Sequence, residues 1–190
     1  MSAISANLIE TELIRHTVNA SNFEPTRKYI GLSRIQESAD RLAYYYENEQ
    51  IATEEQKLKC YKGYQEEKDL VQRLIKIFSD RISFNEISAY GGKVKGHPDC
   101  WIDDCPTDIK SYALDAYLPI DRISRKNFMQ MQGYLYYSGA EKGFFICESR
   151  ESGKLKVLGA NPIPEVQKEI DEKIKKVITL IDALEYKKVI

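Results

Sequence analysis

Residues 94–112 constrain the fold more than any other part of the chain. They read VKGHPDCWIDDCPTDIKSY, with apolar residues on both sides of a short polar segment that contains a proline. This pattern predicts a strand over residues 94–102, a tight turn over 103–106 and a second strand over 107–112. The stretch therefore predicts two neighbouring strands that carry several carboxylates.

The second of these strands fixes the relative positions of its charged side chains. Because side chains on a strand alternate between faces, Asp108 and Lys110 project to one side and Ile109 to the other. An antiparallel partner would bring Asp99 beside Asp108. Two carboxylates that close repel each other unless a hard divalent cation such as Mg²⁺ neutralises them, and Lys110 could hold a developing negative charge. An Asp-x-Lys triplet is also common on a solvated strand face, where it forms a weak surface pair.

A helix upstream offers a further carboxylate. Thr53 and Gln56 form a capping-box pattern, which predicts a helix that begins at residue 53 and extends as far as residue 78. Glu67 lies one turn before the apolar stripe of this helix and points to the same side, whereas Glu66 is rotated away. We therefore choose Glu67 as the acidic partner of the site and keep Glu66 as the alternative.

The segment between this helix and the hairpin favours extended structure. Residues 82–90 predict a strand, and the two glycines at 91–92 predict a turn into the next one. Pro98 indicates that Asp99 lies at a bulge or an edge, where a metal ligand would be accessible. His97 is either a ligand, a contact of the scissile phosphate or a simple hydrogen-bonding partner of a carboxylate.

Basic and polar residues on other segments are candidates for nucleic-acid contacts. A cluster of Arg122, Arg125 and Lys126 precedes a helix predicted over residues 127–138, and on that helix Gln130 and Tyr134 are four apart and share a face. Arg34 and Arg41 lie near three tyrosines at 44–46, whose rings could stack on single-stranded bases or pack in the core. Each charge cluster is also typical of a solvated helix start.

The order of these pieces resembles the PD-(D/E)XK nuclease superfamily, in its RecB-like and phage-exonuclease branch. The matching motifs are GYQEE at residues 63–67, GHPD at 96–99, DIK at 108–110 and QMQGY at 130–134. Residues 29–46 resemble the entry helix of phage and CRISPR-adaptation nucleases. The resemblance covers residues 29 to about 150, and its motifs are short, so their order and spacing carry it.

The resemblance implies an α/β fold with a restriction-endonuclease-like core: a mixed central β-sheet flanked by helices, with extra N-terminal and C-terminal helices. We expect one domain, with residues 1–28 as an N-terminal helical extension, 29–160 as the nuclease core and 161–190 as a C-terminal helix. The predicted activity is metal-dependent hydrolysis of DNA phosphodiester bonds by an exonuclease. The alternatives are a structure- or sequence-selective endonuclease and a non-catalytic binding or scaffold protein.

The resemblance also assigns roles to residues. Asp99, Asp108 and the Ile109 carbonyl would hold Mg²⁺ or Mn²⁺, with Glu67 acting through a water molecule and His97 as a further candidate ligand. Lys110 would position or activate the attacking water. Gln130 would bind a phosphate or a metal-bound water, and Tyr134 would orient Gln130.

Composition limits the remaining possibilities. The net charge of −1 and pI near 6.2 provide no overall positive field, so binding to DNA requires local basic patches. The cysteines at 60, 100, 105 and 147 lack the spacing of a zinc site, and we expect reduced thiols and no iron–sulfur cluster.

Without a signal peptide or membrane span, we expect a cytoplasmic protein of a bacterial or phage-infected cell. Its partners would be linear DNA, a further copy of the chain or a recombination protein.

Other elements follow from hydrophobic periodicity and capping patterns. Expected helices lie at residues 3–20, at 33–49 with Ser33 and Gln36 as a capping box, and at 164–190, and an expected hairpin lies at 142–158. The last helix would cover a sheet face or pair with another copy.

Overall fold

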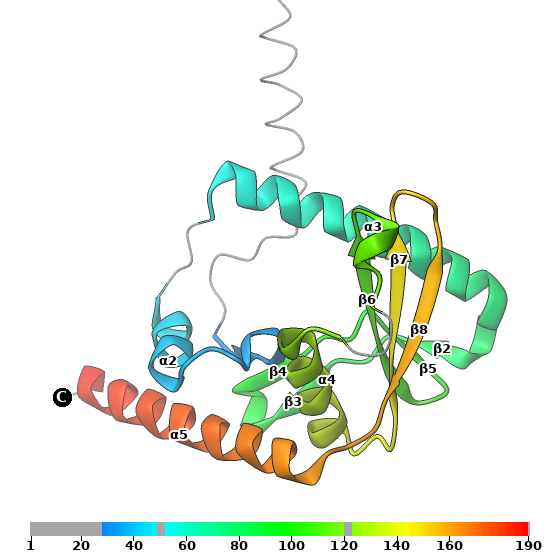
Figure 1. Ribbon diagram of the computed structural model, residues 1–190. Coiled ribbons are helices and arrows are strands. Elements are labelled where there is room, and N and C mark those ends of the chain that lie inside the picture. The colour runs from blue at the N-terminus through cyan, green and yellow to red at the C-terminus, as the bar shows by residue number, and fades with distance from the viewer. Residues whose placement is uncertain (1–27, 49–51, 120–122, 190) are drawn as a thin grey trace, which may run out of the picture.

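The computed structural model describes residues 28–48, 52–119 and 123–189 (Figure 1). The helix expected at residues 3–20 and Arg122 lie outside these ranges. The helices are α2 (Ala39–Glu47), α3 (Glu54–Phe78), α4 (Arg125–Ser138) and α5 (Pro164–Val189). The strands are β1 (Ile30–Gly31), β2 (Ile82–Ser83), β3 (Ile87–Ala89), β4 (Val94–Gly96), β5 (Cys100–Ile102), β6 (Cys105–Tyr112), β7 (Gly143–Ser149) and β8 (Leu155–Ala160).

The strands form two mixed sheets flanked by helices, which confirms the predicted α/β class. The five-stranded sheet has the order β2-β5-β6-β7-β8 and the three-stranded sheet the order β1-β4-β3. Within the first, β6 and β7 run parallel while the other neighbours are antiparallel. The mixed sheet that we expected is therefore divided, with β6 in the middle of the larger part.

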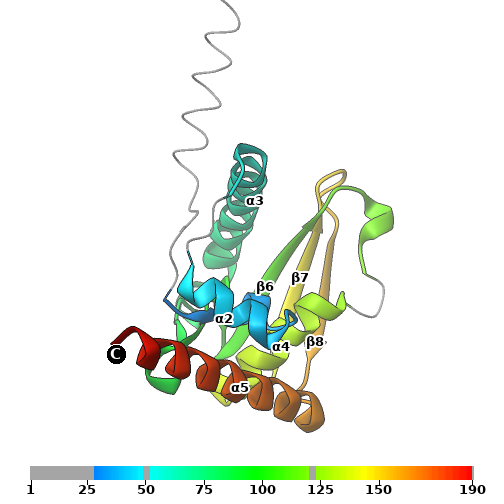
Figure 2. The ribbon, with the colours of Figure 1, turned by 90° about the vertical axis from the view of Figure 1, so that its left-hand side faces the viewer.

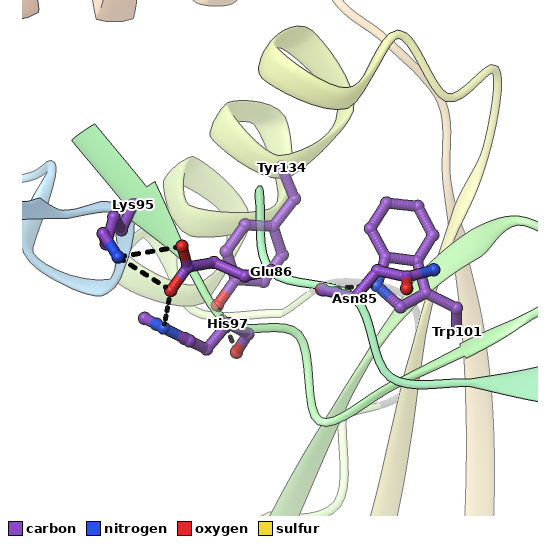
Figure 3. A network of polar contacts seen from close by, with 6 residues as sticks. All are labelled: Asn85, Glu86, Lys95, His97, Trp101 and Tyr134. Atoms are coloured by element: carbon purple, nitrogen blue, oxygen red, sulfur yellow. Dashed lines mark hydrogen bonds and ion pairs between the residues drawn. The ribbon is translucent and has the colours of Figure 1, made fainter. Parts of the chain in front are cut away.

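The division occurs where two expected strands are interrupted. Residues 94–102 form β4, paired with β3, and β5, paired with β6, with Pro98 between them. Proline has no N–H to donate to a ladder, so a continuous strand through this point is disfavoured. Residues 82–90 likewise separate into β2 and β3, and in the gap the Trp101 Nε1 donates to the Asn85 carbonyl at 2.9 Å (Figure 3).

The turn between β5 and β6 is shorter than predicted. Ile102 pairs with Cys105, so only Asp103 and Asp104 form the loop, with φ of 48° and 61°. Positive φ at both loop positions is the geometry that matches the twist of an antiparallel hairpin, and aspartate tolerates it better than most residues. Strand β6 therefore begins at Cys105 rather than at residue 107.

Helices cover both faces of the five-stranded sheet, as Figure 2 shows for α3 and α4. Leu70 and Leu74 of α3 pack with Ile109 of β6 on one face. On the other face, α4 belongs to a larger core that also includes α2 and the buried stripe of α5, formed by Ile170, Ile174, Val177 and Ile181. In the ranges described, no helix is long and apolar enough to span a membrane.

Capping residues confirm one helix start and correct another. The Thr53 hydroxyl accepts from the Gln56 N–H, and the Gln56 side chain accepts from the Thr53 N–H, so the predicted capping box is present. The Ser33 box was wrong: residues Leu32–Arg34 form a 3₁₀ turn, and α2 begins after Ser38, whose hydroxyl accepts from Arg41 N–H. Burial of Leu32 and Ile35 in the core selects this later start.

A glycine allows α4 to approach β4. A Cβ added at Gly96 would lie 2.8 Å from Leu32 Cδ1 and 2.8 Å from Tyr134 Cε1, closer than real Cβ contacts. Gly63 in the middle of α3 has no such neighbour within 4 Å. An added methyl group would therefore clash with its neighbours at Gly96 and would meet open space at Gly63.

We predict that Gly96→Ala destabilises the protein by about 1–3 kcal/mol, because an overpacked core must shift Tyr134 or Leu32. Gly63→Ala is the matched control and should stabilise by about 0.5–1 kcal/mol, since alanine is the better helix former at an open position. Urea denaturation of both variants measures the two free energies of unfolding. Equal effects of the two substitutions would contradict the close packing at Gly96.

Candidate active site

Strand β6 places Asp108 and Lys110 together, as its alternation predicts. The side chain of Asp108 is 2% exposed, and its Oδ2 lies 2.6 Å from Lys110 Nζ. Ile109, between them, packs into the cluster beneath α3. The Asp-x-Lys pair thus joins a buried carboxylate to a half-buried ammonium group and is not the solvated surface pair that was the alternative.

Asp99 reaches the same strand from the residue before β5. Pairing of β5 with β6 ends at Cys100 and Thr107, and beyond this point Asp99 Oδ2 accepts the Ile109 N–H at 2.5 Å. The N–H and C=O of one strand residue point to the same edge. The Ile109 carbonyl therefore faces the side on which Asp99 lies, and the predicted neighbourhood of Asp99 and Asp108 is present.

Burial and mutual repulsion dominate the electrostatics of these acids. Burial, together with the charge of Asp108, raises the pKa of Asp99 to about 8. Burial also raises the pKa values of Asp108 and Glu67. For Lys110, burial acts to lower the pKa, but the charges of the three acids outweigh it and raise the pKa. Three carboxyl groups therefore share one ammonium group, and Glu67 is electrostatically part of the site.

The alternative acid, Glu66, has other partners. Its Oε2 accepts from Ser111 Oγ at 2.5 Å, and its Oε1 lies 3.3 Å from Arg150 Nη1. The charges of Lys110 and Asp108 act on the Glu67 carboxyl, and its role at the site stays a prediction.

The donor set fits a hard divalent cation. Asp108 Oδ2 is buried and accepts no hydrogen bond, although the Lys110 ammonium lies beside it. Across the described ranges, no three acidic, histidine or cysteine side chains already form a complete ligand group. Burial and the neighbouring acids raise the pKa of Asp99, and a cation bound by carboxylate and carbonyl oxygens would favour the ionised forms of these acids.

Gln130 and Tyr134 connect α4 to this site. Gln130 Nε2 lies 3.4 Å from Asp108 Oδ1 and 2.6 Å from the Tyr134 hydroxyl, to which it donates. The hydroxyl in turn donates to the His97 carbonyl at 3.0 Å (Figure 3). The pair therefore bridges helix and sheet, and it also orients the Gln130 amide at Asp108.

The His97 imidazole points to another acid. Its Nε2 lies 2.8 Å from Glu86 Oε2, and Lys95 Nζ lies 2.9 Å from Glu86 Oε1 (Figure 3). The alternative in which His97 is a hydrogen-bonding partner of a carboxylate accounts for this contact, with Glu86 as the carboxylate. A role for His97 as metal ligand stays a prediction.

A cavity of about 450 Å³ opens next to the acids. It is lined by Tyr29, Gly31, Leu32, Ser33, Tyr64, Glu67, Lys95, Gly96, His97, Gln130 and Tyr134. The sequence analysis did not assign Tyr29, Ser33, Tyr64 or Lys95 to the site. Lys95 could have been found, since it alternates with Val94 and Gly96 on a strand and must face the opposite side.

The predicted basic residues divide into two groups. Lys126 is exposed, and its charge acts to lower the pKa of Asp108, while Arg125 is exposed in the first turn of α4. Arg34 and Arg41 instead lie around the ring of Tyr45. The structure therefore brings Lys126 to the acids and gathers Arg34 and Arg41 elsewhere.

We predict that ionisation of Asp99 lowers the free energy of unfolding of the metal-free protein as the pH rises. The folded protein holds the Asp99 proton up to a pKa of about 8, whereas an unfolded chain releases it near about 4. Between these two pKa values the folded state binds more protons than the unfolded state. The free energy of unfolding of the wild type therefore falls as the pH rises. Asparagine cannot ionise, and its amide oxygen can still accept the Ile109 N–H. The free energy of unfolding of Asp99→Asn, relative to wild type, should therefore rise from about pH 5 to about pH 8.

Urea denaturation in EDTA measures this difference. Asp103→Asn is the control: the hydrogen bond from Arg81 lowers the pKa of the exposed Asp103, so its contribution is constant across the same range. A pH-independent difference for Asp99→Asn would show that Asp99 ionises normally in the fold.

The structure of this chain aligns with several solved protein structures. LHK-Exo in complex with dAMP aligns with a TM-score of 0.62 and 14% identity, covering 85% of this chain and 92% of that one. The alkaline exonuclease LHK-Exo from Laribacter hongkongensis aligns with a TM-score of 0.58 and 13% identity, covering 94% and 98%. SSO0001 aligns with a TM-score of 0.57 and 21% identity, covering 90% and 86%.

No family model and no curated protein matches the sequence. At these identities the likeness to the solved structures establishes the fold alone. The chain shares the overall fold of the solved alkaline exonuclease LHK-Exo.

Proposed function

We propose that this protein is a divalent-metal-dependent nuclease that hydrolyses DNA phosphodiester bonds from strand ends. The observation that carries the proposal is the group formed by buried Asp108 and half-buried Asp99, Lys110 and Glu67, of which Glu67 lines a cavity. The fold shared with LHK-Exo, solved with the mononucleotide dAMP, supports a nucleic-acid substrate. A role in phage recombination, repair or DNA processing belongs to the same proposal.

Asp99, Asp108 and the Ile109 carbonyl would hold Mg²⁺ or Mn²⁺, and Glu67 would contact it through a water molecule. A divalent cation, when bound, lowers the pKa of a water molecule and offsets the charge of the acids and the phosphate. Asp108 supports this assignment through its buried, unsatisfied Oδ2.

The residues around the acids handle the substrate. Lys110 directs its ammonium group toward the attacking water and the phosphate oxygens, where negative charge develops. Gln130 is held by Tyr134 and lines the cavity, and a phosphate oxygen would take the place of Asp108 Oδ1 as acceptor of its second amide N–H. In the reaction, a water oxygen bonds to phosphorus, and the bond from phosphorus to the departing sugar oxygen breaks, with a proton transferred to that oxygen.

The cavity favours action at a strand end. Its volume of about 450 Å³ is that of a small-molecule site and suits one terminal nucleotide. The aromatic rings of Tyr29 and Tyr64 in its lining offer faces for a base. A strand that ends in this cavity places its last phosphodiester near Glu67 and Gln130.

We predict that Lys110→Ala and Asp108→Asn each lower the cleavage rate by about 100-fold or more, because the first removes a positive charge from the site and the second removes a charged ligand of the proposed cation. The assay uses end-labelled linear single- and double-stranded DNA with Mn²⁺, Mg²⁺ or EDTA. Lys156→Ala, an exposed lysine on β8, is the matched control and should retain the wild-type rate. Wild-type cleavage by either site variant, with circular dichroism showing a native fold, would reject the assignment.

Linear and covalently closed circular DNA test the preference for ends. We expect linear DNA to be degraded to mononucleotides while closed circles stay intact, since a closed circle presents no terminal nucleotide. Gel analysis and chromatography of the products measure this. Nicked or linearised circles would instead support the endonuclease alternative, and binding without turnover under any metal would support the non-catalytic one.

A further inference from the structure

A stack of two arginines and one tyrosine lies outside the catalytic group. The Arg34 guanidinium carbon lies 4.5 Å from the ring centroid of Tyr45, and that of Arg41 lies 5.4 Å from it. Arg41 Nε also donates to the Tyr45 hydroxyl at 2.6 Å. Tyr44 packs edge-on at a centroid distance of 6.1 Å and is 60% exposed. We call these four residues the Arg34–Tyr45 patch.

The patch continues from the wall of the cavity. Ser33 lines the cavity and Arg34 follows it in the same 3₁₀ turn, so the cation lies one residue beyond the wall. Buried Leu32 anchors this turn in the core, and Lys173 of α5 donates to the Ile35 carbonyl at 3.0 Å. The backbone from which Arg34 projects is therefore fixed at the cavity wall.

Its chemistry matches unpaired nucleic acid. Guanidinium groups bind phosphates, and aromatic rings stack on bases of any sequence when those bases are unpaired. A protein with a net charge of −1 needs such local cations to hold a polyanion. Glu37, whose Oε2 lies 3.4 Å from Arg41 Nη1, opposes this function by neutralising part of the charge.

We propose that the Arg34–Tyr45 patch binds the single-stranded segment of nucleic acid next to the end held in the cavity, with Arg34 and Arg41 on phosphates and the exposed Tyr44 against a base, while Tyr45 positions the two guanidinium groups. The proposal rests on the proposed nuclease function for the direction of the strand. Binding by the patch is separate from hydrolysis and requires neither the acids of the active site nor a divalent metal ion.

The competing explanation is that the stack only fastens the 3₁₀ turn to α2. In that case, substitutions would lower the melting temperature without a specific loss of binding. Glu37 separates the two explanations, because removing its charge weakens a structural ion pair but strengthens an anion-binding surface.

The test is fluorescence anisotropy of a labelled oligothymidylate in EDTA, where no metal-dependent hydrolysis occurs. The variants are Arg34→Gln/Arg41→Gln, Tyr44→Ala and Glu37→Gln. Lys142→Gln/Lys156→Gln, two exposed lysines on and beside the β7–β8 hairpin, is the control with the same change in net charge. Thermal melting accompanies each measurement, and a duplex of equal length measures the preference for single strands.

We expect the double arginine variant to bind about tenfold more weakly and its salt dependence to flatten by about one phosphate contact or more. Tyr44→Ala should reduce the preference for single strands, and Glu37→Gln should tighten binding by about twofold. The control should bind within about twofold of wild type.

Equal losses in the arginine and lysine double variants, weaker binding by Glu37→Gln, or unchanged binding with a lower melting temperature would each overturn the proposal. Failure of the nuclease proposal is a different result: the wild type would bind oligothymidylate in EDTA through the patch and yet leave DNA intact with every metal.

Discussion

Burial of the Asp108 carboxylate in the middle of a sheet is the constraint on which the site depends. An ionised carboxylate loses its hydration when buried and is tolerated only with charge or hydrogen-bond compensation. Here Lys110 supplies the charge from the same face of β6, and Gln130 approaches the second oxygen from α4. The strand, its lysine and the helix must therefore form together, because each alone would leave a buried polar group without a partner.

Gln130, which contacts Asp108, also begins a chain of hydrogen bonds that connects the two sheets. Gln130 donates to the Tyr134 hydroxyl, and Tyr134 donates to the His97 carbonyl just after β4. Gly96 on β4 leaves space for the Tyr134 ring. The five-stranded sheet thus holds Asp108, and the far end of this chain of hydrogen bonds lies just after β4 of the three-stranded sheet. Helix α4 contacts both sheets and contributes Gln130 and Tyr134 to the cavity lining.

Local patterns predicted the parts of this arrangement that depend on neighbours in the chain. The Thr53 capping box and the alternation on β6 follow from spacing alone. The split of the expected strands did not, because it depends on which partner each half finds after Pro98. Likewise Ser33 and Ser38 offer similar local caps, and only burial of the intervening core residues distinguishes them. The cavity wall joins Tyr29 and Lys95, which only the parallel pairing of β1 with β4 brings together.

The distribution of charge reconciles an acidic site with a polyanionic substrate. Asp99, Asp108 and Glu67 would repel a phosphate backbone if no cations lay near it. Lys110 lies among them, Lys126 acts on Asp108 from the start of α4, and the Arg34–Tyr45 patch begins one residue beyond the cavity wall. Long-range steering contributes little at a net charge of −1, so affinity must come from these short-range contacts. Binding of this kind holds a strand only where it is in contact, which favours a substrate whose end is already seated over one that is captured along its length.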